Sequence, residues 1–170
     1  RCYPVGGRFT PAARELYELV LAAQEASLEA SRPGATLPEI HAASVRVLTQ
    51  GMVDLGLLKG EVDGLIETES YRPYYMHGTS HWLGLDVHDV GAYVIRNGAE
   101  DPKPRPLAPG MAYTIEPGIY IAPDAPDAPD AYKGIGIRIE DDVVITSDGY
   151  LNLTRAIPKT ADDIEAWVSR

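Results

Sequence analysis

The apolar residues of this chain recur with one period before Met76 and with another after it. Over residues 10–32 they return at steps of three and four, the spacing of one face of a helix. That stripe consists of Leu16, Leu19, Val20, Ala23 and Ala26. After Met76, short alternating runs are separated by glycine and proline turns, which is typical of strands. The change of period predicts an α+β fold in one domain, because 170 residues are enough for a single core.

Capping residues mark where the expected helices begin and end. Thr10 followed by Pro11 predicts a helix start, since a hydroxyl caps the first turn and proline at the first helical position loses no hydrogen bond. Thr36 and Glu39 form a capping-box pattern, and Gly56 provides a stop. The expected helices cover residues 10–32, 36–55, 62–67 and 161–168.

The second half of the chain contains alternating segments that predict strands. In one of them Arg138 and Glu140 are two residues apart, so both side chains project from the same face. The repeated Ala-Pro-Asp motif of residues 122–130 is stiff and polar, and predicts a surface loop. The expected strands cover residues 111–116, 135–140 and 143–145.

Composition and charge exclude several classes of protein. The net charge of −10 argues against a nucleic-acid partner, which requires a surplus of lysine and arginine on one face. No apolar run approaches the length of a membrane span, and residues 1–7 do not resemble a signal peptide. The single cysteine, Cys2, excludes an intrachain disulfide and is compatible with the cytoplasm.

Three of the four histidines, His77, His81 and His88, fall within twelve positions. An isolated histidine is more often a hydrogen-bonded packing residue than a ligand, and we interpret His41 in that way. The cluster favours the opposite interpretation. Imidazole supplies a neutral nitrogen to a divalent metal and also moves protons near physiological pH, and a hydrolytic site needs both functions.

Glu116 and Glu140 are the carboxylates that complete this pattern. Taken alone, Glu116 fits an edge-strand residue that faces solvent, and Glu140 fits an ion pair with Arg138 on the same face. Together with the histidine cluster, the two glutamates provide the oxygen ligands that a pair of divalent ions requires.

Several continuous stretches carry a family resemblance. They are YMHGTSHWLGLDVHDVG at 75–91, TIEPGIY at 114–120, GIGIRIED at 134–141 and the opening PVGGRFT at 4–10. In these stretches the chain resembles the pita-bread metallopeptidases and, among them, the Xaa-Pro aminopeptidase or aminopeptidase P branch. The resemblance implies an incomplete pita-bread fold, in which helices pack on the outer face of a curved antiparallel sheet. Residues 1–170 would form part of the catalytic domain, without the family's upstream strand pair and N-terminal domain.

The resemblance also implies a set of metal ligands. His81, Glu116 and Glu140 occupy ligand positions, with Glu140 bridging two ions. Two Mn²⁺ ions are expected in the complete site, although Co²⁺, Zn²⁺ or Fe²⁺ would also fit these ligands. The family uses two further aspartates, which the resemblance places before Arg1. We therefore expect this chain to be a fragment that holds at most one ion weakly and is inactive alone.

Catalytic roles follow from the same resemblance. His77 and His88 fall on positions that contact substrate and assist proton transfer. Glu116 manages the proton of the attacking hydroxide, and His88 steadies the tetrahedral intermediate. Arg138 organises the site around the bridging glutamate.

The expected function is that of a metal-dependent exopeptidase that releases the N-terminal residue preceding proline. Its partners would be peptides with proline in the second position, with no nucleic acid or membrane, and the full-length protein would be a cytoplasmic homo-oligomer. An Xaa-Pro dipeptidase (prolidase) differs in the peptide length that it accepts. A non-catalytic pita-bread binding domain is the third alternative. Such domains lose the histidine and glutamate positions that this chain retains.

Overall fold

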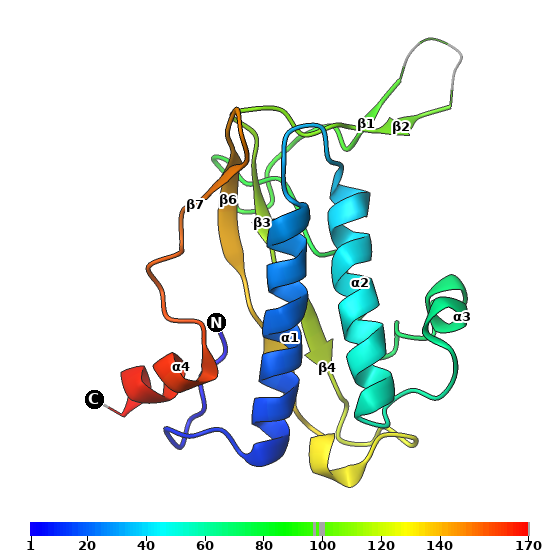
Figure 1. Cartoon of the computed structure of the whole chain (residues 1–170), viewed down its shortest axis with the longest axis vertical. Coiled ribbons are helices and arrows are strands. Elements are labelled where there is room, and N and C mark those ends of the chain that lie inside the picture. The colour runs from blue at the N-terminus through cyan, green and yellow to red at the C-terminus, as the bar shows by residue number, and fades with distance from the viewer. Residues whose placement is uncertain (97, 99–100, 170) are drawn as a thin grey trace.

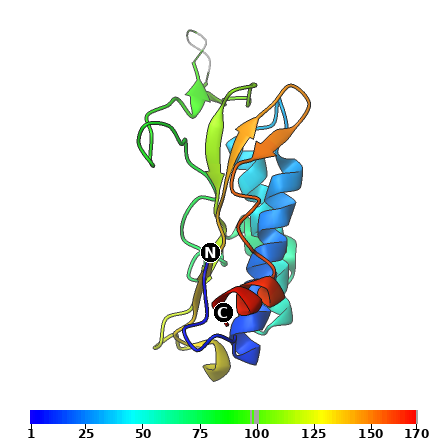
Figure 2. The same cartoon turned by 90° about the vertical axis from the view of Figure 1, so that its left-hand side faces the viewer.

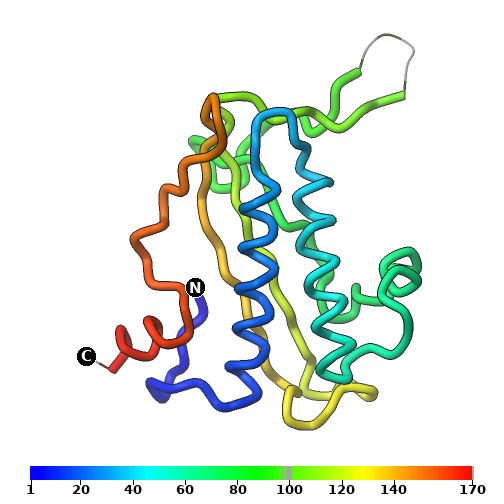
Figure 3. The backbone as a smooth tube through the Cα atoms, in the orientation of Figure 1, coloured from blue at the N-terminus to red at the C-terminus, as the bar shows by residue number. Residues whose placement is uncertain are grey.

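Two long antiparallel helices cover one face of a set of antiparallel strands (Figures 1 and 2). The computed structural model describes residues 1–96, 98 and 101–169. The four α-helices of this part are α1 (Pro11–Ala30), α2 (Leu37–Asp54), α3 (Val62–Glu67) and α4 (Ala161–Val168), and a 3₁₀ helix, η1, covers Asp130–Tyr132. The backbone rises through α1 and returns through α2, and α4 brings the end of the chain close to its beginning (Figure 3). The predicted α+β class is confirmed.

The predicted helix starts are confirmed by their hydrogen bonds. The Thr10 hydroxyl accepts a bond from the backbone nitrogen of Ala13 at 3.2 Å. The Thr36 hydroxyl accepts from the nitrogen of Glu39, whose carboxylate in turn accepts from the nitrogen of Thr36 at 2.7 Å. Both ends of this capping box are therefore satisfied, which fixes the first turn of α2.

The strands form three small antiparallel sheets. The largest has the order β3–β6–β7, while β4 pairs with β5 and β1 pairs with β2. The strands are β1 (Val94–Ile95), β2 (Lys103–Pro104), β3 (Ala112–Ile115), β4 (Gly118–Tyr120), β5 (Gly136–Arg138), β6 (Asp141–Ile145) and β7 (Tyr150–Asn152). The antiparallel pairing agrees with the expected sheet. Strands β1, β2, β4 and β7 lie outside the three expected strand segments.

The expected strands over 111–116 and 135–140 both end earlier than predicted, and the residues just beyond their ends face each other. Strand β3 ends just before Glu116 and Pro117, and β5 ends just before Ile139 and Glu140. Proline has no N–H to donate, which accounts for the break. One register runs through the pairs on both sides of the gap, and it places Glu116 opposite Glu140. Opposite residues of an antiparallel pair share a face, so both glutamates project the same way.

The other face of these strands packs against the helices. Tyr113 and Ile115 of β3 lie in one buried cluster with Leu28 of α1 and Ile40 of α2. Residues 122–130 form the expected loop, most of it exposed, although Ala128 is buried in the core. In the described part of the chain, no helix is both long and apolar enough to cross a membrane.

Candidate metal centre

His81, Glu116 and Glu140 converge on one point. One ligand atom from each residue lies within 4.8 Å of those of the other two. His81 belongs to the loop between α3 and β1, Glu116 follows β3, and Glu140 precedes β6. Glu116 is only 7% exposed, which excludes the solvent-facing interpretation of this residue. Three side chains distant in the sequence therefore surround a space that one cation can fill.

The orientation of His81 fits a metal ligand. Its Nδ1 lies 2.9 Å from the backbone oxygen of Trp82, so the ring donates its Nδ1 proton to that carbonyl. In the neutral ring, the lone pair is then on Nε2, which lies 3.0 Å from Oε1 of Glu116. A lone pair facing a carboxylate oxygen is favourable only when a cation or a proton lies between them. A hydrogen bond from the outer nitrogen of this kind commonly orients metal-binding histidines.

The negative charges of Glu116 and Glu140 repel each other when no cation lies between them. Burial and the nearby charges of Glu116 and Asp142 raise the pKa of Glu140. Oε1 of Glu116 accepts a hydrogen bond from the Thr114 hydroxyl at 3.0 Å, and Oε2 lies 3.4 Å from Nη1 of Arg138. Arg138 therefore forms an ion pair with Glu116 across the gap, whereas the sequence had suggested Glu140.

Arg138, Tyr120 and His77 form a hydrogen-bonded chain beside the carboxylates. Nε of Arg138 donates to the Tyr120 hydroxyl at 2.5 Å, and this hydroxyl lies 2.8 Å from Nε2 of His77. Nδ1 of His77 donates to the backbone oxygen of Gly78 at 2.8 Å, which leaves Nε2 to accept from Tyr120. The chain of contacts fixes both the tautomer and the orientation of His77.

His88 stands next to His81 without being part of the ligand cluster. The two rings meet edge to face with their centroids 4.2 Å apart. His88 lies on the exposed loop after Trp82, whereas His81 is partly buried. A group in this position has access to a molecule approaching the cluster from solvent.

The similarity of this chain to known proteins agrees with such a centre. Residues 1–147 match the model of metallopeptidase family M24. The chain belongs to metallopeptidase family M24. It is 53% identical over 166 residues to the Xaa-Pro aminopeptidase of Escherichia coli, a match that covers 98% of this chain and 36% of that protein.

Solved aminopeptidase structures show the same fold. The aminopeptidase PepP of Pseudomonas aeruginosa superposes with a TM-score of 0.93 at 52% identity, covering 99% of this chain and 37% of that one. A zinc-substituted Escherichia coli aminopeptidase P in complex with product gives 0.91 at 52% identity, with coverages of 100% and 38%. These neighbours confirm the pita-bread fold. The chain spans little more than a third of the length of these relatives.

Tyr120 is a residue of this centre for which no role was predicted from the sequence. Period-two alternation places Tyr120 on the same face as Glu116, and this signal was available in the sequence. Gly118 lies between them. A Cβ atom at Gly118 would lie 2.5 Å from the Tyr120 hydroxyl and 2.8 Å from the backbone oxygen of Ile137. The glycine therefore leaves the space that the tyrosine hydroxyl occupies beside Arg138.

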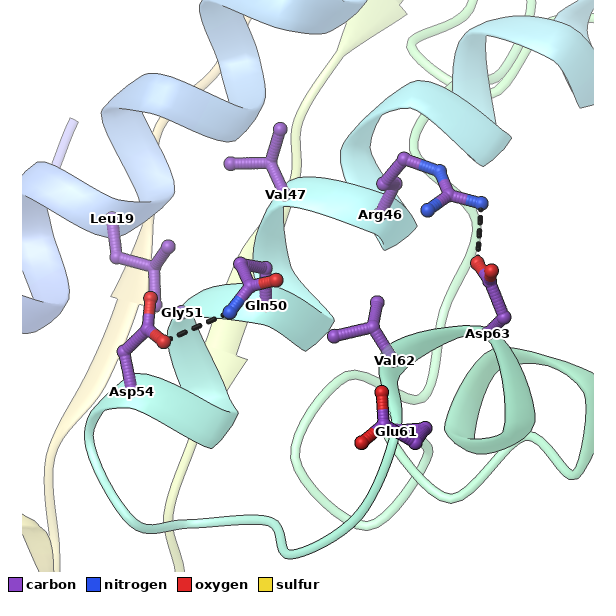
Figure 4. Close-up of a pocket in the computed structure, with 9 residues that line it drawn as sticks. All are labelled: Leu19, Arg46, Val47, Gln50, Gly51, Asp54, Glu61, Val62 and Asp63. Carbon is purple, nitrogen blue, oxygen red and sulfur yellow. Dashed lines mark hydrogen bonds and ion pairs between the residues drawn. The ribbon is translucent and has the colours of Figure 1, made fainter.

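A cavity of about 590 Å³ lies away from this centre, between α1, α2 and the start of α3 (Figure 4). Four of its polar side chains form two pairs, Arg46 with Asp63 and Gln50 with Asp54, both at 2.8 Å. Leu19 and Val47 supply apolar surface. The cavity opens on the helical side of the M24 domain and adds no residue to the metal centre.

Proposed function

We propose that this chain supplies the metal centre of an Xaa-Pro aminopeptidase, which releases the N-terminal residue preceding a proline. The observation that carries the proposal is the convergence of His81, Glu116 and Glu140 within 4.8 Å. Its support is the 53% identity to an Xaa-Pro aminopeptidase. Because the chain spans 36% of that relative, the activity is proposed for the full-length protein.

His81 would bind a metal through Nε2, and Glu116 and Glu140 through their carboxylates, with Glu140 shared between two ions. When bound, a divalent metal supplies positive charge that polarises a carbonyl group and lowers the pKa of water. We propose Mn²⁺ as the resident metal. One imidazole with carboxylate oxygens suits Mn²⁺ and also Zn²⁺.

The remaining side chains would handle protons and substrate. The ion pair with Arg138 and the hydrogen bond from Thr114 hold Glu116 in one orientation, so this carboxylate is placed to accept a proton at the cluster. His77, held by Tyr120, would orient the peptide. His88, on the exposed side of His81, would donate a hydrogen bond to the substrate oxygen as negative charge develops there.

The substrates proposed are peptides with proline in the second position. We further propose that the full-length protein is a cytoplasmic homo-oligomer. The isolated 170-residue chain should hydrolyse Xaa-Pro peptides negligibly, because the three ligands that we propose among its described residues are too few to hold two ions.

The test is hydrolysis of Xaa-Pro-Xaa tripeptides and Xaa-Pro dipeptides by a full-length protein that contains this chain, with and without Mn²⁺. Metal-dependent release of the first residue from the tripeptide supports the proposal. Preference for the dipeptide would assign a prolidase instead. Absence of hydrolysis of both peptides in the metal-loaded protein would overturn the enzymatic proposal and favour a binding domain.

A further inference from the structure

Thr79 lies between helix α2 and Glu116, the residue that follows β3, and it is only 1% exposed. Its hydroxyl contacts three buried or partly buried partners: Nδ1 of His41 at 2.8 Å, Oγ of Ser44 at 2.7 Å and the hydroxyl of Tyr75 at 2.6 Å. A hydroxyl donates one hydrogen bond and accepts two, so these contacts use its full capacity. These three hydrogen bonds fix the position of Thr79 relative to α2.

Backbone bonds connect Thr79 directly to the metal ligands. The backbone oxygen of Thr79 accepts a hydrogen bond from the nitrogen of Glu116 at 2.8 Å, and that of His81 accepts from the nitrogen of Thr114 at 3.0 Å. The nitrogen of His81 also donates to the Thr114 hydroxyl at 3.2 Å. The segment 79–81 is therefore paired with the strand end that carries Glu116, and Thr79 is the residue of this segment bonded to α2.

His41 makes the contact from the helix with one ring nitrogen. Its Nδ1 lies 2.8 Å from the hydroxyl oxygen and 3.3 Å from the backbone nitrogen of Thr79, so it contacts both the hydroxyl and the N–H of this residue. Burial lowers the pKa of His41, which keeps its ring neutral. A neutral ring is what this uncharged network requires.

We infer that His41 and Thr79 are positioning residues, which set the distance between His81 and Glu116 from helix α2. Neither residue touches the metal or the substrate in this arrangement. The inference rests on the proposed function, since it concerns the affinity of the proposed metal centre. Partners that orient ligands from outside typically account for about a 10- to 100-fold change in metal affinity.

The experiment compares Mn²⁺ affinity, kcat and KM among variants of the full-length protein at a temperature at which circular dichroism shows each variant folded. Thr79→Val removes the hydroxyl while keeping the side-chain shape, and Thr79→Ser keeps the hydroxyl. Thr49→Val is the matched control. Thr49 is also fully buried, and its hydroxyl has no partner in the described part of the chain.

We expect Thr79→Val and His41→Ala each to weaken Mn²⁺ binding by about 10- to 100-fold and to lower kcat, with KM for the peptide nearly unchanged. Thr79→Ser should stay within about threefold of the wild type, as should Thr49→Val. The double variant of His41 and Thr79 should bind Mn²⁺ about as tightly as whichever single variant has the lower affinity, because the two residues act through one contact.

A Thr79→Val protein that melts earlier but keeps wild-type Mn²⁺ affinity and kcat would overturn the inference, since the network would then serve stability alone. That result would leave the proposed function intact. Failure of the wild type itself to bind Mn²⁺ would overturn the proposed function, and the inference with it.

Discussion

Glu140 and Asp141 are consecutive carboxylates at the start of β6 whose side chains project to opposite faces, and their surroundings differ completely. Five side chains lie around the carboxylate of Asp141: Thr154, Arg1, Gln24, Asn152 and Lys159, at 2.6 to 3.5 Å. Burial opposes its ionisation, but the hydrogen bonds from Thr154, Arg1, Gln24 and Asn152 prevail and lower the pKa of Asp141 to about 2. In the described part of the chain, the carboxylate of Glu140 receives no hydrogen bond. Its pKa is raised.

The face that carries Asp141 serves stability, and the face that carries Glu140 serves the proposed function. Asp141 is saturated by groups of the protein, so it holds the strand to α1 and to the ends of the chain. Glu140 faces Glu116 instead, and like charges placed opposite each other are destabilising. The carboxylate oxygens of Glu140 are therefore available to bind a cation. Arg1 connects the two sides, because its guanidinium bonds both the Asp141 carboxylate and the backbone oxygen of Glu140.

The largest expected effect is that of Glu140→Gln in the full-length protein. Mn²⁺ affinity should fall by more than about 100-fold and hydrolysis should reach background, because a ligand is lost rather than one of its supports. Stability of the metal-free protein should not decrease, since one of two facing carboxylates becomes neutral. Calorimetric Mn²⁺ titration and urea unfolding in the presence of EDTA measure the two quantities. A clear loss of metal-free stability would remove the contrast with Asp141.

Variants of His81 and His88 test the roles of two further residues on the metal-facing side. His81→Ala should weaken metal loading and turnover together, because it deletes a proposed ligand. His88→Ala should retain the metal and lower kcat by about 10² to 10⁴-fold, the usual cost of losing a positioned proton-transfer group or hydrogen-bond donor. Equal loss of metal from both variants would reassign His88 as a ligand.

Asp141→Asn addresses the opposite face. Neutralising Asp141 leaves the guanidinium of Arg1 buried without its counter-ion, and breaking a buried pair in this way costs about 3 to 5 kcal/mol of unfolding free energy. Urea unfolding of the metal-free protein is the measurement. Asp124→Asn, the same change in the exposed loop 122–130, should cost less than about 0.5 kcal/mol. Similar values for the two variants would contradict the structural role of Asp141.

The sequence predicts local features of this fold better than its long-range contacts. The capping box of Thr36 and Glu39 and the alternation around Glu116 depend on residues a few positions apart, and the structure contains both. The donors to Asp141 come from as far as 140 positions away, and no local period indicates them. The Thr79 network likewise joins residues 35 and 38 positions apart. Pro117 signalled a strand break, but only the register shows that the break places Glu116 opposite Glu140.

The smallest expected effect concerns the pH dependence of stability that arises from His41. Burial, followed by the charges of His77 and Arg72, lowers the pKa of His41, while Glu69 acts in the opposite direction. The unfolded chain, with an ordinary histidine pKa of about 6.5, therefore binds more protons than the fold. This contribution to stability is complete above about pH 6.5 and is lost as the pH falls below it. In metal-free protein, the difference in unfolding free energy between pH 7.5 and pH 5 should be smaller in His41→Gln than in the wild type. The two proteins differ only at residue 41, so the difference between them isolates His41, and equal pH dependence would show that this ring ionises as freely in the fold as in the unfolded chain.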